Sequence, residues 1–304
     1  MASLSHRQGW SFAVLLTIFP CVFFAGTKNE APLVTFRLST SEVRVSFFAT
    51  DENNRLVKNL NKRDFAVVDG DRVIRDFRSL TRSNETALDV FLLVDASESV
   101  GPEFRRTTEA ALHLASDKTP GDQISVITFA GLKPAVLCER DCNGSAAQAT
   151  LISMKPAGTT PLFDTLAFTS RFISGRQSPA VRQTLILFSD GNDTISLTSA
   201  NDAIDALAAS GAVVYTVDTA PPNVPSNGRA VLRQMAEATG GRYLRMHDNS
   251  ANILQAVLDD LHASYVVTYQ LPSRVAGFHS LHILPQHNLK LRFHCRRGYF
   301  YEKN

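Results

Sequence analysis

The stretch that decides the fold is VFLLVDASES, at residues 90–99. Its first five residues are apolar without any alternation, which is typical of a strand buried on both faces of a parallel sheet. The apolar run ends at Asp95, and a helical pattern follows from about residue 102 to residue 117. A buried strand that leads directly into a helix predicts the first unit of an α/β domain.

Apolar strands and amphipathic helices alternate from this stretch to residue 264. Further strands are expected at 124–129, 184–188 and 213–217, a short edge strand near 135–137, and helices at 161–174, 199–210, 229–239 and 251–262. This order predicts a doubly wound, Rossmann-like, mostly parallel sheet with helices on both faces. We place the α/β domain at residues 87–264.

The two flanks of this domain show the period-two alternation of β-strands instead. In the N-terminal flank, residues 28–86, alternating stretches surround the hairpin turn Asp69-Gly70-Asp71. The C-terminal flank, residues 265–304, alternates in the same way in three short stretches. Neither flank has enough strands to be stable alone, so we expect the strands of one to pair with those of the other.

The first 27 residues are typical of a targeting segment. Residues 12–25 are apolar except for Thr17 and contain Pro20. Spanning a bilayer takes about 20 apolar residues, so this run fits a secretory signal peptide better than a transmembrane helix. We expect a secreted or periplasmic protein, with an uncleaved membrane anchor as the alternative. No later apolar run is long enough to span a membrane, so no membrane-spanning segment is expected in the mature chain.

Charge and cysteine content narrow the classes of partner. The chain has 31 Lys and Arg against 29 Asp and Glu, and a net charge of +2 is too small to support non-specific nucleic-acid binding. Cys138 and Cys142 could close a small disulfide loop in an oxidising compartment or remain free thiols. A metal site there is disfavoured because no further Cys or His stands at ligand spacing.

Small polar side chains follow two of the expected strands, where the ligands of open α/β sheets bind. Asp95 ends the first strand and is followed by Ser97 and Ser99, and Asp190 follows the strand at 184–188. In the strand order 3-2-1-4-5-6 these two strands are neighbours, so Asp95 and Asp190 should face each other. The spacing Asp-x-Ser-x-Ser places one carboxylate and two hydroxyls on the same side of an extended loop.

A third loop supplies a further candidate oxygen ligand. The stretch AGTTP, residues 157–161, precedes the middle helix, and Thr159 or Thr160 could reach an ion. Hydroxyl and carboxylate oxygens without His or Cys favour Mg²⁺, with Mn²⁺ or Ca²⁺ as substitutes, over zinc or copper. Helix caps and turns are the competing interpretation of each loop taken singly. Three such loops in order at the strand ends favour a metal site.

These residues resemble the von Willebrand factor A domain, whose metal-ion-dependent adhesion site combines Asp-x-Ser-x-Ser, a Gly-Thr loop and an Asp-Gly after the fourth strand. The resemblance implies five metal ligands, which are Asp95, Ser97, Ser99, Thr159 and Asp190. Thr159 is preferred to Thr160 because it follows the loop glycine. Glu98 departs from the Gly often found inside the motif. The family mechanism implies a protein partner whose Asp or Glu carboxylate fills an open position on the cation.

The flanks are similar to the acidobacterial-type VWFA-related family of exported bacterial proteins. The similarity rests on LSTSEVRV at 38–45, LNKRDFAV at 60–67 and RRGYF at 296–300. It covers nearly all of the mature chain and implies that both flanks join in one β-sandwich-like module.

The function that we expect is metal-dependent protein interaction or adhesion. An enzyme is not expected, since the chain has no Gly-x-Ser-x-Gly, no His-Glu-x-x-His and no phosphate-binding Gly-x4-Gly-Lys loop. The alternatives are a structural or assembly module of the cell envelope without metal-dependent binding, and a Mg²⁺-dependent hydrolase. The hydrolase has the weaker support, because Ser97 stands where a phosphatase of this fold would carry a second carboxylate.

Overall fold

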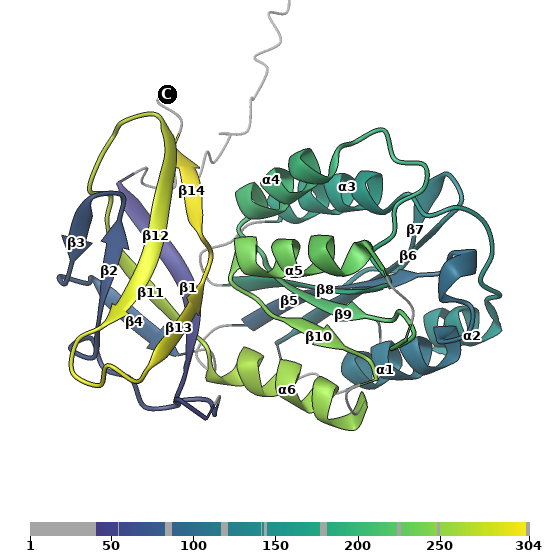
Figure 1. Ribbon diagram of the computed structural model, residues 1–304, viewed down its shortest axis with the longest axis horizontal. Coiled ribbons are helices and arrows are strands. Elements are labelled where there is room, and N and C mark those ends of the chain that lie inside the picture. Colours follow the sequence, from purple (N-terminus) through teal and green to yellow (C-terminus); the bar gives the residue numbers. More distant parts are fainter. Residues whose placement is uncertain are drawn as a thin grey trace, which may run out of the picture. The chain divides into compact units, whose positions relative to one another are not determined.

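The computed structural model describes most of the chain after residue 40 (Figure 1). The described residues are 41–53, 55–82, 87–116, 121–140, 142, 145–176, 181–223, 226–247 and 250–301. The expected signal peptide, residues 1–27, lies outside them. Within the described residues, none of the helices combines the length and apolar character needed to cross a membrane.

A six-stranded sheet forms the centre of the α/β domain. Its strand order is β10-β9-β8-β5-β6-β7, and every neighbouring pair is parallel except β6 and β7. The strands are β5 (Ala87–Asp95), β6 (Gln123–Ala130), β7 (Lys133–Cys138), β8 (Val181–Ser189), β9 (Val213–Asp218) and β10 (Tyr243–Arg245). The predicted doubly wound, mostly parallel sheet is therefore confirmed.

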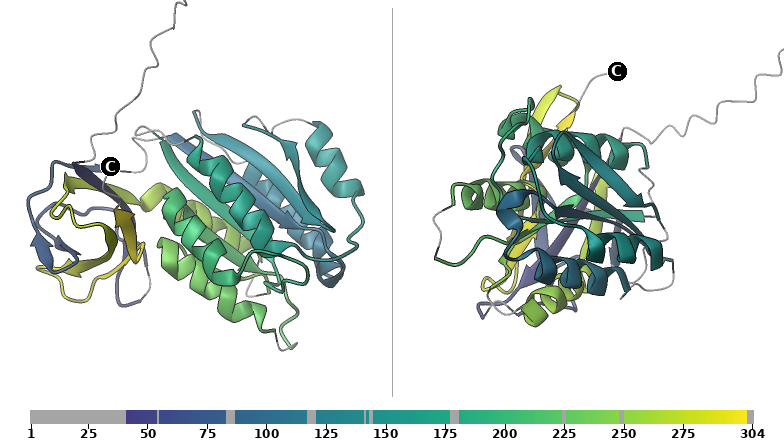
Figure 2. Two further views of the ribbon diagram at one scale, coloured as in Figure 1. Left: turned by 90° about the horizontal axis from the view of Figure 1, so that it is seen from above. Right: turned by 90° about the vertical axis from the view of Figure 1, so that its right-hand side faces the viewer.

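Six helices cover this sheet (Figures 1 and 2). They are α1 (Phe104–Ser116), α2 (Ser145–Ser153), α3 (Leu162–Ser174), α4 (Ala200–Ser210), α5 (Gly228–Thr239) and α6 (Ser250–Ala263). Apolar residues of α1, α2 and α6 share one core cluster, and those of α3, α4 and α5 share another. The helices therefore lie on both faces of the sheet, three on each.

Strand β5 contributes to both of these cores because successive side chains of a strand point to opposite faces. Leu92 and Val94 belong to the core that contains α1 and α6, whereas Phe91 and Leu93 belong to the core with α3, α4 and α5. All four side chains are fully buried. Burial of each contributes roughly 1.5–3 kcal/mol to stability, which explains why this stretch fixes the centre of the sheet.

The flanks build a second module of two four-stranded sheets. The sheet orders are β13-β1-β11-β4 and β14-β12-β2-β3. The strands are β1 (Glu42–Thr50), β2 (Phe65–Asp69), β3 (Arg72–Ile74), β4 (Ser79–Arg82), β11 (Tyr265–Gln270), β12 (Gly277–Pro285), β13 (Arg292–Cys295) and β14 (Gly298–Tyr301). One hydrophobic cluster includes residues of both sheets, so the sheets pack face to face as a sandwich.

Strands from opposite ends of the chain are neighbours in both sheets. Strand β1 pairs antiparallel with β11, from Glu42 opposite Gln270 to Phe47 opposite Tyr265. Strand β2 pairs in the same way with β12. Phe47 also packs edge-on against Phe65, with ring centroids 5.0 Å apart. The α/β domain is therefore an insertion between two halves of one sandwich.

The structure also contains elements that the sequence pattern did not predict. Helix α2 has the sequence SAAQATLIS, in which small and apolar residues show no helical period. Strand β10 has only three residues and β14 only four, which is too short for a clear alternation. The first helix begins at Phe104 because a single 3-10 turn, Glu98–Val100, precedes it.

Candidate metal centre

The carboxyl ends of β5 and β8 lie side by side, because Val94 pairs with Phe188 in parallel register. Asp95 is the last residue of β5, and Asp190 directly follows β8. The Ser189 hydroxyl, at the end of β8, donates a hydrogen bond of 2.6 Å to Asp95 Oδ2. The strand-order reversal therefore lies between these two aspartates.

Burial sets the electrostatics of Asp95. Its side chain is fully buried, and this burial raises the pKa of the carboxyl to about 6. Hydrogen bonds from Ser189 and Ser97 oppose the rise in pKa, whereas the charge of nearby Asp190 adds to it. In the described part of the chain, neither aspartate has a Lys, Arg or His ion-pair partner. A divalent cation would balance both charges, so the donor set fits one.

The two serines of the Asp-x-Ser-x-Ser stretch lie on the same side as Asp95. The Ser97 backbone N–H donates to Asp95 Oδ1 at 2.9 Å, and the Ser97 and Ser99 hydroxyl oxygens are 3.2 Å apart. Ser97 is fully buried and Ser99 is exposed, so this row of oxygens leads from the core to the surface. Ser97 precedes the 3-10 turn, but its side chain makes no capping hydrogen bond. Its hydroxyl interacts instead with Asp95 and Ser99, so it belongs to the same cluster of oxygens.

The threonine loop is hydrogen-bonded directly to the Asp-x-Ser-x-Ser loop. The Glu98 N–H donates to the Gly158 carbonyl at 3.1 Å, and the Ala157 N–H donates to the Ala96 carbonyl at 3.0 Å. These two backbone bonds hold the loops side by side. The five residues that the resemblance implies thus come from three adjoining loops at one edge of the sheet.

The two threonines of this loop differ in what their hydroxyls do. Thr159 is exposed, and its hydroxyl donates to the Gly131 carbonyl at 3.1 Å. Thr160 is buried, its N–H donates to the Thr194 hydroxyl at 2.7 Å, and its carbonyl accepts from the Thr194 N–H at 3.0 Å. Its own hydroxyl has no hydrogen-bond partner among the described residues. Hydroxyl availability therefore favours Thr160 as the ligand.

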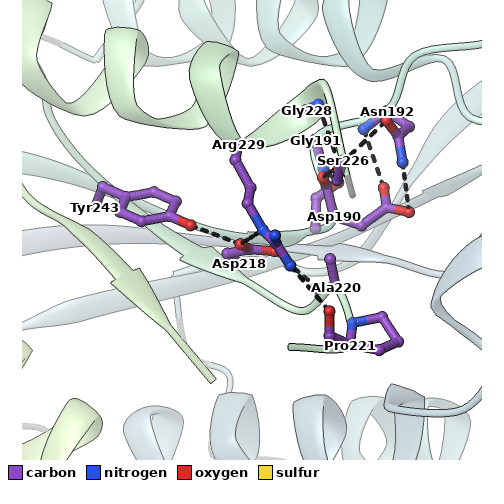
Figure 3. A network of polar contacts seen from close by, with 11 residues as sticks. Asp190, Gly191, Asn192, Asp218, Ala220, Pro221, Ser226, Gly228, Arg229 and Tyr243 are labelled. Atoms are coloured by element: carbon purple, nitrogen blue, oxygen red, sulfur yellow. Dashed lines mark hydrogen bonds and ion pairs between the residues drawn. The ribbon is translucent and has the colours of Figure 1, made fainter. Parts of the chain in front are cut away.

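A polar network holds Asp190 in place (Figure 3). The Asn192 backbone N–H and side-chain amide donate to Asp190 Oδ1 and Oδ2, each at 3.0 Å. The Ser226 hydroxyl donates to the Asp190 carbonyl at 3.2 Å. Gly191 has a φ of +77°, and a Cβ there would lie 2.5 Å from the Gly228 carbonyl oxygen. Glycine is required at 191 for both reasons.

Beside this network, a second cluster fixes the loop that follows β9. Arg229 Nε donates to Asp218 Oδ2 at 3.0 Å, and the Tyr243 hydroxyl donates to the same oxygen at 2.6 Å. Arg229 also donates to the Pro221 carbonyl at 2.9 Å (Figure 3). Sequence analysis did not identify this cluster, nor Ser189, Asn192 and Ser226. A serine directly before Asp190 at a strand end was the one available signal.

The cysteines among the described residues lie outside these loops. A disulfide joins Cys138, at the end of β7, to Cys142. Burial raises the pKa of the free Cys295 thiol to about 11. Among the described residues, no group of three or more His, Cys, Asp or Glu could hold a metal ion. The candidate centre is of another kind, with two carboxylates and neutral hydroxyls.

The fold is an open α/β domain with polar loops at the carboxyl ends of its two central strands. The family model for the von Willebrand factor type A domain matches residues 89–260. The chain therefore belongs to the von Willebrand factor A family, which indicates a role in protein–protein interaction or adhesion.

Among known proteins, the human collagen alpha-6(VI) chain is 27% identical over 248 residues, or 74% of this chain. The chain spans only about one tenth of that relative's length, since the match covers 10% of it.

Three solved structures are similar at low identity. An aerotolerance-related membrane protein of Bacteroides fragilis has 20% identity and a TM-score of 0.45, covering 57% of this chain and 98% of its own. BatB of Bacteroides thetaiotaomicron has 17% identity and a TM-score of 0.43, and the match covers 58% of this chain and 97% of BatB. The manganese-loaded TRAP protein of Plasmodium vivax has 15% identity and a TM-score of 0.44, and the match covers 79% of this chain and 100% of the TRAP chain.

Proposed function

We propose that this chain is an exported interaction module whose adhesion to a protein partner depends on a divalent cation. Asp95, Ser97, Ser99, Asp190 and one threonine hydroxyl would hold Mg²⁺, for which Mn²⁺ or Ca²⁺ could substitute. When bound, the cation supplies a positive charge with one position left for an Asp or Glu carboxylate of the partner. The chain's own residues position the ion and exclude water from its inner side.

The observation that carries this proposal is the pair of buried carboxylates without a cationic partner. Asp95 is fully buried and Asp190 is 6% exposed, and the charge of Asp190 raises the cost of charging Asp95. An unbalanced buried charge is expensive, so a fold that keeps two such groups together is best explained by an ion between them. Two carboxylates balance the charge of a divalent ion, and the neutral hydroxyls leave it a coordination position that a partner's carboxylate can fill.

The threonine ligand in this proposal is the hydroxyl of residue 159 or that of residue 160. The resemblance implies Thr159, whereas the Thr160 hydroxyl supports Thr160 more strongly, because it makes no hydrogen bond within the described residues and the Thr159 hydroxyl does. Thr159→Val and Thr160→Val are a matched pair, because each removes a hydroxyl and keeps a β-branched side chain. The variant that removes the ligand should weaken metal binding at least tenfold, as loss of even an indirect contact to a metal does.

The proposal also assigns a role to each part of the chain. Residues 1–27 are a signal peptide, residues 28–86 and 265–304 form the sandwich, and residues 87–264 form the interaction domain. An enzymatic role is not proposed. The sandwich carries the interaction domain as an insertion, with Ser264 as the only residue between α6 and β11.

The test is calorimetric titration of Mg²⁺ and Mn²⁺ into the folded protein and two variants. Asp190→Asn should abolish uptake of one equivalent of metal. Asp193→Asn is the matched control, because Asp193 lies three positions away and accepts from the Phe163 N–H and from Ser196. This control should reduce stability by about 1 kcal/mol but keep metal uptake. Absence of uptake by the unaltered protein would favour the structural-module alternative.

A further inference from the structure

The loops around the threonine stretch carry the two most exposed large apolar side chains in the described part of the chain. They are Leu197, at 97% exposure, and Leu132, at 79%. Single exposed apolar residues on a protein surface are ordinary, so exposure alone does not indicate a binding surface. Their position is the informative observation, because both lie beside the same short loop.

Hydrogen bonds place both leucines beside Thr159 and Thr160. Leu132 directly follows Gly131, whose N–H donates to the Thr159 carbonyl at 2.8 Å and whose carbonyl accepts from the Thr159 hydroxyl. Leu197 lies three residues after Thr194, which exchanges two hydrogen bonds with the Thr160 backbone. Three residues of chain span at most about 10 Å. The leucines therefore flank the threonine loop from two different neighbouring loops.

The loop that carries Leu197 is held rigidly. The Leu197 N–H donates to Asp164 Oδ2 at 3.0 Å, and the next residue, Thr198, donates to Asp164 Oδ1 through both its N–H and its hydroxyl. Ile195 is a further large apolar side chain of this loop, with 38% exposure. Fixed backbone beneath exposed apolar side chains lowers the entropy lost on binding, which favours a contact surface over a loose loop.

Polar side chains bind Asp190 itself, since Asn192 and Ser226 are joined to Asp190 and to each other by hydrogen bonds. The exposed apolar side chains beside the threonine loop are Leu132, Leu197 and Ile195. We call the three apolar residues the apolar rim.

We propose that the apolar rim selects a protein segment in which the metal-binding Asp or Glu is flanked by bulky apolar side chains. The inference rests on the proposed function, since the acid is anchored by the cation and the rim binds its neighbours. In an extended segment, side chains two positions apart point to the same face. Apolar residues two positions before and after the acid can therefore face the rim while the carboxylate faces the ion.

The proposal predicts that three synthetic peptides will bind differently in the presence of Mn²⁺. The probes are GSLGEGLSG, with leucine on both sides of the acid, GSSGEGSSG, with serine there, and GSLGQGLSG, without the acid. Binding is measured by isothermal titration calorimetry at high peptide concentration, which detects millimolar affinities. The leucine peptide with Glu should bind about tenfold tighter than the serine peptide, as expected when two leucines lose part of their contact with water. The Gln peptide should not bind.

Two double variants separate the rim from general surface effects. Leu132→Ser with Leu197→Ser should bind the leucine and serine peptides equally. Val275→Ser with Leu289→Ser is the matched control, because these sandwich residues are 70% and 77% exposed, and it should keep the tenfold preference. All four positions are exposed enough for the variants to fold. Metal uptake by each variant is measured in parallel.

Each outcome decides the proposal. Equal, metal-dependent binding of the leucine and serine peptides by the unaltered protein would overturn the rim and leave the proposed function standing. No metal-dependent binding of either acidic peptide would overturn both. Self-association in Mn²⁺ that the rim variant removes would assign the surface to a second copy of this chain, and would also overturn the proposal.

Discussion

Gly191→Ala is the substitution that tests most sharply how the fold holds Asp190. Gly191 has a φ of +77°, in the left-handed region that side chains with a Cβ rarely adopt. A Cβ at this position would also lie 2.5 Å from the carbonyl oxygen of Gly228, which is closer than any real contact. The clashing atom belongs to the backbone, so no side-chain rotation can relieve the clash.

The cost has two parts that can be separated. Left-handed backbone costs an alanine about 1–2 kcal/mol, and overpacking against a rigid neighbour adds about 1–3 kcal/mol. Gly70→Ala isolates the first part, because Gly70 has a φ of +61° with nothing within 4 Å of an added Cβ. We therefore expect Gly191→Ala to lower the free energy of unfolding by about 2–5 kcal/mol and Gly70→Ala by about 1–2 kcal/mol.

The assay combines urea unfolding with calorimetric titration of Mn²⁺. Relief of the clash must move residue 191 away from Gly228, and the neighbouring Asp190 carboxylate moves with it. Gly191→Ala should therefore lose metal affinity as well as stability, whereas Gly70→Ala should keep the affinity of the unaltered protein. Equal losses of stability in both variants, with metal affinity retained in each, would refute the idea that the close contact between Gly191 and Gly228 positions Asp190.

Two further predictions concern stability alone. Burial raises the pKa of Asp260 from 3.8 to about 7 despite its ion pair with Arg242, so its stabilising contribution is complete below about pH 4 and is lost as the pH rises through 7. Asp260→Asn should flatten the pH dependence of the unfolding free energy across this window, and an unchanged slope in urea unfolding would contradict the assignment. Reduction of the disulfide between Cys138 and Cys142, which are four positions apart, should cost about 2 kcal/mol in the same assay, with metal uptake retained.

Much of the fold could be predicted from the sequence because its strands are long and apolar. The run that ends at Asp95 is buried on both faces, which is typical of a parallel sheet covered by helices. The order of strands and helices then placed Asp95 beside Asp190, as the parallel pairing of β5 with β8 confirms. Helix α2 was not predicted because its apolar residues do not recur with the period of a helix.

The details of the candidate centre could not be predicted, because they depend on contacts between loops that are distant in sequence. Ser226 bonds to Asp190 across 36 positions, and Gly131 engages the Thr159 hydroxyl across 28 positions. No local pattern shows that the Thr159 hydroxyl is bonded to a carbonyl while the Thr160 hydroxyl makes no hydrogen bond within the described residues. The choice between Thr159 and Thr160 therefore depends on tertiary structure.

The central claim is that oxygen atoms of three loops surround one divalent ion. A crystal structure of the protein grown with Mn²⁺, with anomalous scattering recorded at the manganese edge, tests this claim directly. The account predicts a single strong peak within bonding distance of side-chain oxygens of Asp95, Ser97, Ser99 and Asp190 and of one threonine hydroxyl. No peak at this edge of the sheet, or a peak bound only by other residues, would contradict it.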